Sequence, residues 1–401
     1  MKRTIKLAVA AAVALTSTAA FATNGDHLIG VGAKSRGMGG VGIGMSHGAE
    51  SALSNPANIT SVKGTEVSFG GTIFMPDVET NMGAGFSRSK ADLSVIPAVS
   101  VASKLNDNFY IGVGMYGVAG MGTDYRQATG MQSNMNMVTN LQLMQFAVPM
   151  AYKVDGLSIG IAPVLQYGSL DINYDTNGTT NAGGESQTQG VAQDFGMGYN
   201  IGLSYETSGL TVGASYKSAI TMEYAGQISK AMQQFGQTTY TNDKLEQPAE
   251  IGFGASYKID GHTFAADYKR IKWSDAKGYE DFKWEDQNVY MLGYQYAQDS
   301  WALRAGYNYA KSPISEQSPN GAGSIGALRN VFNLLGFPAI VERHYTLGGT
   351  YEFSKTVSAD LAYVYAPTVK NSYAYDLGNG ASTITTNHGQ DAVTAQVNFK
   401  F

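Results

Sequence analysis

The feature that most constrains this chain is a strict two-residue alternation in its final segment, residues 393–401. Apolar residues at odd positions alternate with polar residues at even positions: Val393, Ala395, Val397, Phe399 and Phe401 against Thr394, Gln396, Asn398 and Lys400. This period gives a strand one apolar face and one polar face. Similar alternation recurs from Val67 onward in about fourteen segments, joined by short turns on one side and long polar loops on the other. The asymmetry is typical of bacterial outer-membrane β-barrels and argues against a soluble sandwich.

Residues 1–22 have the composition of a cleaved secretory leader. A basic start precedes an apolar run from Leu7 to Leu15, and Ala20-Phe21-Ala22 is an A-x-A cleavage site. We expect a mature chain that begins at Thr23 and carries 24 basic against 32 acidic residues, a net charge of about −8. This acidity argues against nucleic acid as a partner.

The remaining composition limits how the chain can enter a membrane. It contains no cysteine, which excludes disulfides and thiolate metal sites. After the leader, no apolar run approaches the roughly 18 residues of a membrane helix. A membrane-spanning fold would therefore have to be a barrel.

A glycine-rich segment, residues 30–60, precedes the first expected strand and ends in the turn Asn55-Pro56-Ala57. It is the only long portion ahead of the strands that could fold inside the cylinder they close. Pro56 biases Asn55 away from helix, and the Asn55 side chain can bond turn amides. We therefore predict an all-β fold: a transmembrane antiparallel β-barrel of about 14 strands (66–401), with an N-terminal hatch (23–65) in its lumen after the signal peptide (1–22).

Several motifs occur in an order that spans the mature chain. They are SALSNPANI, a glycine-rich third strand ending in Gly122-Thr123-Asp124-Tyr125, QPAEIGFGASY, DYKRIKWSD, WALRAGYNYAKSPI, HYTLGGTYEF with VSADLAYVYA, and the closing aromatic strand. This order resembles that of the FadL family of outer-membrane long-chain fatty-acid transporters.

The resemblance implies passive uptake of hydrophobic molecules through the bacterial outer membrane, with no enzymatic activity and no cofactor. A ligand would meet an apolar surface on the extracellular loops, enter a pocket beside the hatch, and leave sideways through a gap at the kinked third strand. The terminal Phe401 resembles the signal read by the barrel-assembly machinery. We expect a monomer that contacts outer-membrane lipid and lipopolysaccharide.

The third strand contains the candidates for a lateral opening. Glycine weakens a pairing edge and tolerates bulge angles, and the candidate positions are Gly112, Gly114, Gly117 and Gly120. The alternative is that these glycines only make room for the hatch.

Candidate ligand contacts come from the loops and the lumen. In the FadL family the third and fourth extracellular loops supply the docking surface, but the third loop here, residues 176–194, is wholly polar. The docking candidates are apolar residues of the fourth and sixth loops: Met232, Phe235, Leu328, Phe332 and Leu335. Their alternative role is a lid packed on the barrel rim. Arg304 could hold a ligand carboxylate with its guanidinium fork or pair with a lumen carboxylate.

Two short motifs point to enzymes but lack the required context. Residues 37–42 fit G-x-G-x-x-G and residues 44–48 fit G-x-S-x-G, yet no βαβ unit or strand-to-helix turn surrounds them. The five histidines show no metal-ligand spacing.

Long-chain fatty acids are the expected ligands. Uptake of aromatic or aliphatic hydrocarbons is the alternative within the family, and an outer-membrane enzyme or adhesin is a more distant one.

Overall fold

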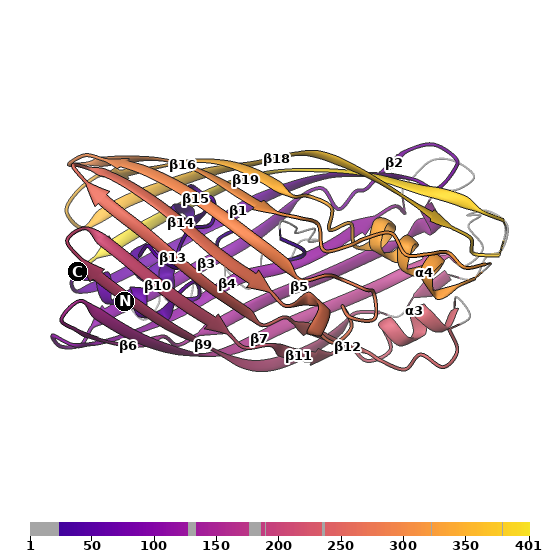
Figure 1. The fold of residues 1–401 in the computed structure, drawn as a ribbon, viewed down its shortest axis with the longest axis horizontal. Helices are drawn as coiled ribbons and strands as arrows, with labels where there is room; N and C mark the ends of the chain where they lie inside the picture. The colour runs from indigo at the N-terminus through magenta and orange to yellow at the C-terminus, as the bar shows by residue number, and fades with distance from the viewer. Residues whose placement is uncertain are drawn as a thin grey trace.

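The structure, a computed structural model, describes residues 24–126, 134–175, 186–188, 190–234, 237–321, 323–378 and 380–401. The chain forms an antiparallel barrel of fourteen strands, as the alternation predicted (Figure 1). The first strand pairs with the last from Glu66↔Lys400 to Asn81↔Thr385, so the sheet closes on itself. Among the described residues, no helix has the length and apolar character needed to cross a membrane.

The barrel strands follow one another along the chain. They are β1 (Thr65–Asn81), β3 (Ser94–Lys104), β4 (Phe109–Asp124), β5 (Val138–Ala147) with its continuation β6 (Met150–Val154), β7 (Leu157–Asp175), β9 (Ala192–Thr207), β10 (Leu210–Lys217), β13 (Glu250–Ile259), β14 (His262–Ile271), β15 (Gln287–Ala297), β16 (Trp301–Ala310), β17 (Arg343–Glu352), β18 (Val357–Tyr375) and β19 (Ser382–Lys400).

Shorter elements belong to the hatch and the loops. The hatch contains α2 (Ala33–Arg36), η1 (Gly48–Ala52) and η2 (Pro56–Ser61). The loops contain β2 (Ser87–Arg88), η3 (Asn134–Asn136), β8 (Ser186–Thr188), β11 (Ile220–Glu223), α3 (Ile228–Gln234), β12 (Lys244–Gln247), η4 (Trp273–Asp275), α4 (Ile325–Val331) and the π-helical turn η5 (Phe332–Gly336).

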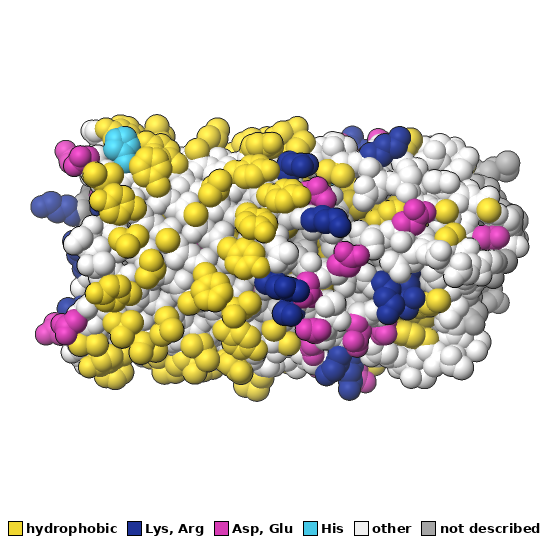
Figure 2. Space-filling model, in the orientation of Figure 1, with side chains coloured by type: hydrophobic (Ala, Val, Ile, Leu, Met, Phe, Trp, Pro, Cys, Tyr) yellow, Lys and Arg dark blue, Asp and Glu magenta, His cyan; other side chains and the backbone are white. Residues whose placement is uncertain are grey.

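The outward faces of the strands carry the apolar side chains of the predicted pattern. On β19, Val393 and Val397 are exposed, whereas Thr394 and Gln396 are buried towards the lumen. Figure 2 shows hydrophobic side chains covering the half of the molecule that carries the short turns, and a band of charged side chains where the long-loop half begins. This is the surface of a barrel that faces lipid and meets water at the membrane boundary.

The last two strands are longer than expected. The sequence suggested a loop over residues 368–388, but β18 and β19 stay paired from Val369↔His388 to Tyr375↔Ser382. A register shift between Ala366 and Val369, next to Pro367, interrupts the apolar–polar alternation. Because of this interruption, the alternation did not predict that the strand continues. Tyr373 and Ile384 are buried in this extension, so its inner face packs on the loops.

The lumen is filled. The hatch contributes Met38, Val41 and Leu53 to the largest apolar cluster of the described residues, and the sixth loop contributes α4 and η5 to the same cluster. The barrel therefore encloses a packed core between a plug on the short-turn side and a ceiling on the loop side.

Candidate functional site

One carboxylate of the wall binds the backbone of the hatch. The Asp267 oxygens on β14 accept from the backbone N–H groups of Gly42, Ile43 and Gly44 at 2.7, 2.6 and 3.0 Å. Three converging N–H groups form an anion-binding nest, and here the wall supplies the anion. Because a buried carboxylate is stable only when it is hydrogen-bonded, this contact ties the position of the hatch to β14.

The Asn55-Pro56-Ala57 turn bridges two hatch segments and the wall. The Asn55 Oδ1 accepts from the Ala57 N–H at 3.1 Å, which caps η2. The Asn55 Nδ2 donates to the carbonyls of Ile43 and of Leu203 in β9, both at 3.0 Å. Pro56 is the first residue of η2, where its missing N–H leaves no bond unmade.

Wall glycines that the sequence analysis did not single out allow the hatch to approach this closely. A Cβ at Gly202 would overlap the Asn55 Oδ1, and a Cβ at Gly160 would overlap the backbone of Pro56 and Ala57. Other wall glycines that face hatch backbone in the same way are Gly213, Gly306 and Gly348. Their signal in the sequence was glycine at an inward position of an alternating strand, which indicates close backbone approach.

The four glycines of β4 fall into two groups. Gly112 and Gly114 lie where β4 pairs with β3, and that pairing ends at Ala98↔Tyr116. Gly117 and Gly120 lie beyond it, where a bulge interrupts the pairing with β5 between residues 117 and 119. In the described range 24–126, β4 has no ladder partner in β3 beyond Tyr116.

The start of the hatch occupies this unpaired edge. The Leu28 N–H donates to the Val118 carbonyl and the Gly120 N–H to the Asp26 carbonyl, both at 3.1 Å. Closer to the loops, the Lys90 N–H donates to the Asp124 carbonyl at 2.8 Å. This bond connects the segment before β3 to the end of β4 and closes the wall again. Residues 26–28 thus stand where β3 would otherwise bond β4.

An apolar cavity of about 30 Å³ lies between the barrel wall and the loops, and one of its lining residues, Tyr279, hydrogen-bonds Asp26 of the hatch. Residues that line it include Met121, Leu141, Leu170, Tyr279, Trp284 and Phe337. The volume corresponds to about one water molecule, whereas an engineered apolar cavity that binds benzene has about 150 Å³. A hydrophobic ligand can therefore enter only by moving side chains apart.

The loop residues considered for ligand docking face inward. Met232, Leu328, Phe332 and Leu335 are at most 1% exposed and belong to the same apolar cluster as the cavity lining. They form the ceiling over the lumen and are not part of the outer surface. Phe235 lies outside the described residues.

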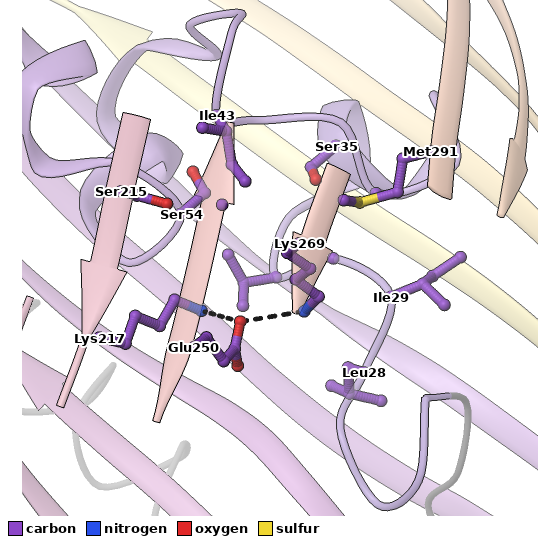
Figure 3. A pocket seen from close by; sticks show the side chains of 14 residues that line it. Leu28, Ile29, Ser35, Ile43, Ser54, Ser215, Lys217, Glu250, Lys269 and Met291 are labelled. Carbon is purple, nitrogen blue, oxygen red and sulfur yellow. Dashed lines mark hydrogen bonds and ion pairs between the residues drawn. The ribbon is translucent and has the colours of Figure 1, made fainter. Parts of the chain in front are cut away.

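A second cavity, of about 50 Å³, lies between the hatch and strands β10, β13 and β14. Figure 3 shows Glu250 between two lysines, with its Oε2 3.4 Å from Lys217 Nζ and 3.1 Å from Lys269 Nζ. The other carboxylate oxygen is 3.0 Å from His27 Nδ1. Two lysines share the Glu250 carboxylate here, next to the apolar side chains of Leu28 and Ile29.

Arg304 already has partners. Its Nε donates to Gln295 Oε1 and its Nη1 to Thr350 Oγ1, each at 2.7 Å, and Nη1 lies 3.8 Å from Asp360 Oδ1. It sits near the short-turn end of β16, away from the loop-side cavity. A ligand carboxylate would have to displace Asp360 to use this guanidinium.

The side chains of the G-x-S-x-G motif are occupied within the hatch. Ser46 Oγ donates to the Asn58 carbonyl at 2.6 Å, and His47 Nε2 lies 2.7 Å from the Val41 carbonyl. The two therefore do not form a nucleophile and base pair. Across the described parts of the chain, no group of three or more His, Asp or Glu side chains is placed to hold a metal ion.

Comparison with known proteins places these features in a family. The family described as "Outer membrane protein transport protein (OMPP1/FadL/TodX)" matches residues 8–325. A 47 kDa outer membrane protein of Pasteurella multocida (strain Pm70) is 22% identical over 394 residues, covering 83% of this chain and 86% of that protein. An uncharacterized protein from the phosphoenolpyruvate carboxykinase gene 5′ region of Chlorobium limicola is 38% identical over 103 residues, covering 25% of this chain and 50% of that protein.

Solved structures share the fold. A Pseudomonas aeruginosa FadL homologue has a TM-score of 0.70 at 15% identity, covering 94% of this chain and all of that chain. The toluene transporters TodX of Pseudomonas putida and TbuX of Ralstonia pickettii have TM-scores of 0.66 and 0.64, each at 18% identity, 93% coverage of this chain and 99% of theirs. Because the family match spans most of the chain, this protein belongs to the OMPP1/FadL/TodX family of bacterial outer-membrane proteins, which are transport channels for hydrophobic compounds and not enzymes.

Proposed function

We propose that this channel takes up long-chain fatty acids passively, binds them beside the hatch and releases them sideways through the barrel wall. The observation that carries the proposal is the contact between the apolar cavity and the unpaired stretch of β4. Met121, which lines the cavity, lies on β4 beyond the end of its pairing with β3. A ligand in the cavity would therefore lie next to the stretch of β4 that has no ladder partner in β3 within the described range 24–126.

Burial of the hydrocarbon chain supplies the driving force for entry. Each buried methylene contributes about 0.8 kcal/mol, so a long chain can offset the rearrangement of the side chains that close the cavity. Exit into the lipid keeps the chain out of water, whereas passage through the hatch into the periplasm would expose it.

Entry and exit are linked by one hydrogen bond. Tyr279 lines the cavity, and its hydroxyl donates to the Asp26 carboxylate, whose residue also bonds Gly120 through its backbone. A ligand that displaces Tyr279 would loosen the hatch segment that covers the unpaired edge. Opening of the wall would then follow ligand binding.

The charges around the hatch favour an acid over a neutral hydrocarbon. Cationic side chains beside the hatch, among them Lys217 and Lys269, can attract a carboxylate from a distance, and a neutral ligand gains nothing from them. Uptake of monoaromatic hydrocarbons is the second candidate. It is supported by the aromatic cavity side chains Tyr279, Phe282, Trp284 and Phe337 and by the fold shared with TodX and TbuX, which are described as toluene transporters.

Uptake of labelled ligands by cells that lack their own transporter tests this function. We expect cells that express the channel to accumulate labelled oleate faster than control cells, and to show little added uptake of labelled toluene. The opposite preference would establish the hydrocarbon alternative.

The exit route is tested by bulky substitutions at the unpaired edge. Gly117→Leu and Gly120→Leu should abolish oleate uptake while the barrel still assembles and binds oleate. Gly349→Val is the matched control, because a Cβ at Gly349 has its nearest contact at 3.4 Å, an ordinary distance. Uptake at the wild-type rate in both leucine variants would place the exit elsewhere, through a displaced hatch.

A further inference from the structure

A buried guanidinium in the hatch has no counter-ion among the described residues. Arg36, the last residue of α2, is 1% exposed. Its Nη1 donates to the Gly30 carbonyl at 3.2 Å, but its Nε and Nη2 have no hydrogen-bond partner in the part of the chain that the structure describes. No Asp or Glu of the described residues pairs with it. Because a buried unpaired charge is costly, a group in this state points to a ligand that the protein binds.

The free edge of Arg36 is the edge that binds carboxylates elsewhere in this chain. Arg126 donates from Nε and Nη2 to the two oxygens of Asp124, at 3.0 and 2.6 Å. Arg270 uses the same two nitrogens on Asp286, at 3.1 and 2.9 Å. This two-pronged contact is specific for a planar anion, and a lysine cannot reproduce it.

The other cations near the hatch differ from Arg36 in this respect. Arg304 has Asp360, and Lys217 and Lys269 share Glu250. Among these four, Arg36 alone offers a guanidinium edge that none of the described protein groups occupies.

Polar side chains of the wall near Arg36 also lack partners. The helix α2 packs against β17, β18 and β19. Among the described residues, the Oδ1 of Asn308 has no hydrogen bond, and its register partner His344 on β17 interacts with the Gln390 side chain on β19 and with no other hydrogen-bonding group. His344 is buried beside Gln390 and within electrostatic range of Arg36. An imidazole N–H there can add a donor to an anion held by Arg36, and ordered water can satisfy the amide oxygens.

We propose that the Nε and Nη2 of Arg36, together with His344, form a carboxylate-binding site between the hatch and the barrel wall. The inference rests on the proposed function, because it assigns the head-group end of the same ligand. A line of contacts leads from the apolar cavity towards this site: Phe337 lines the cavity, and the carbonyl of the next residue, Pro338, lies 2.8 Å from His388 Nδ1. His388 in turn contacts Gln390, 3.1 Å away. The proposal places the chain in the cavity and its carboxylate on the side of Phe337 that these contacts link to Gln390, the neighbour of His344.

The test measures binding of three probes to the full mature protein in neutral detergent at neutral pH. Oleate has chain and charge, oleyl alcohol has the chain without the charge, and acetate has the charge without the chain. Trp284 lines the cavity, so its fluorescence reports the chain, and ¹³C NMR of carboxyl-labelled oleate reports the head group. We expect the wild-type protein to bind oleate more tightly than oleyl alcohol.

Substitution of Arg36 should weaken the binding of oleate, the charged lipid, and leave the binding of oleyl alcohol unchanged. Arg36→Gln and Arg36→Lys should weaken oleate binding about tenfold or more and leave oleyl alcohol binding unchanged, because both lose the two-pronged contact. Arg304→Gln, at the arginine that is already paired, should leave both unchanged. Acetate competes with oleate if free small carboxylates also bind the Nε and Nη2 of Arg36, and this competition should then disappear in Arg36→Gln. If acetate does not compete with oleate, the Nε and Nη2 of Arg36 bind only the carboxylate of the lipid.

Wild-type oleate affinity in both Arg36 variants, or an equal loss of oleyl alcohol binding, would overturn the site and leave the proposed function intact. Failure of the wild-type protein to bind either lipid would count against the proposed function instead. If the Arg36 variants do not fold, the comparison of oleate with oleyl alcohol on the wild-type protein still decides: equal affinities, with a ¹³C signal unchanged from free oleate, would overturn the site.

Discussion

The side-chain amide of Asn55 donates to the backbone carbonyl of Leu203 over 3.0 Å. The residue before Leu203 is Gly202, and a Cβ at that position would overlap the Asn55 oxygen. The hydrogen bond between hatch and wall therefore depends on a wall residue that has no side chain. This relationship suggests how the plug can be loosened without disturbing the strands.

Replacing Asn55 and Pro56 by alanine should loosen the hatch while the barrel still forms. The double change removes three hydrogen bonds of one buried amide, and each buried group left unsatisfied costs about 1–3 kcal/mol. Planar-bilayer recording should show larger or noisier ion conductance. Asn106→Ala is the control, because Asn106 caps a short turn through two similar bonds outside the lumen. A silent trace from the double variant would contradict the role of the motif.

Gly202→Ala should destabilise the protein or displace the hatch, because the added methyl group meets the Asn55 side chain. Overpacking of this kind typically costs about 1–3 kcal/mol. The matched change Gly349→Ala places its methyl group at an ordinary 3.4 Å contact and should be tolerated. The temperature at which the folded band is lost on electrophoresis compares the two variants. Equal temperatures, combined with equal protection of the hatch from protease, would mean that the close approach at Gly202 is unimportant.

Asp267→Asn should release the hatch backbone at one defined place. The amide keeps the shape of the carboxylate, but it presents an NH₂ group to three N–H donors and removes the negative charge. Amide exchange at Gly42, Ile43 and Gly44 should become faster, by an amount equivalent to about 2 kcal/mol of lost protection. Amides in the β1–β19 ladder provide an internal control. Unchanged exchange at the three hatch residues would show that the nest does not depend on the carboxylate.

Phe401→Ala should lower the yield of assembled barrel more than its stability. The Phe401 side chain is 79% exposed, while its backbone N–H and carbonyl bond Thr65 at 2.9 and 3.1 Å and do not depend on the ring. We expect less heat-modifiable protein in the outer membrane of cells and unaltered refolding of the purified chain into detergent. Phe353→Ala, another exposed aromatic change, serves as control. A normal yield in cells would argue against a terminal assembly signal.

The apolar–polar alternation within single strands was sufficient to predict the barrel architecture. The alternation that places Thr394 inside and Val393 outside is a property of one strand, so it can be recognised without knowing the partner strand. The same reasoning located the bulge-prone third strand and the hatch segment, because glycine and proline act on the backbone of their own residues.

Partnerships across the lumen were decided only by the tertiary structure. Asp267 and Gly42 are 225 residues apart in the sequence, and no local period relates them. Arg304 and Arg36 are the same residue type, so the sequence does not distinguish them. In the folded chain Arg304 pairs with Asp360, whereas Arg36 is buried with no Asp or Glu of the described residues as its partner. The loop residues Leu328 and Phe332 were visible as an apolar helix, but only the closed barrel shows that this face turns into the lumen. The sequence determines which face of a strand each side chain takes, whereas long-range packing determines what it meets there.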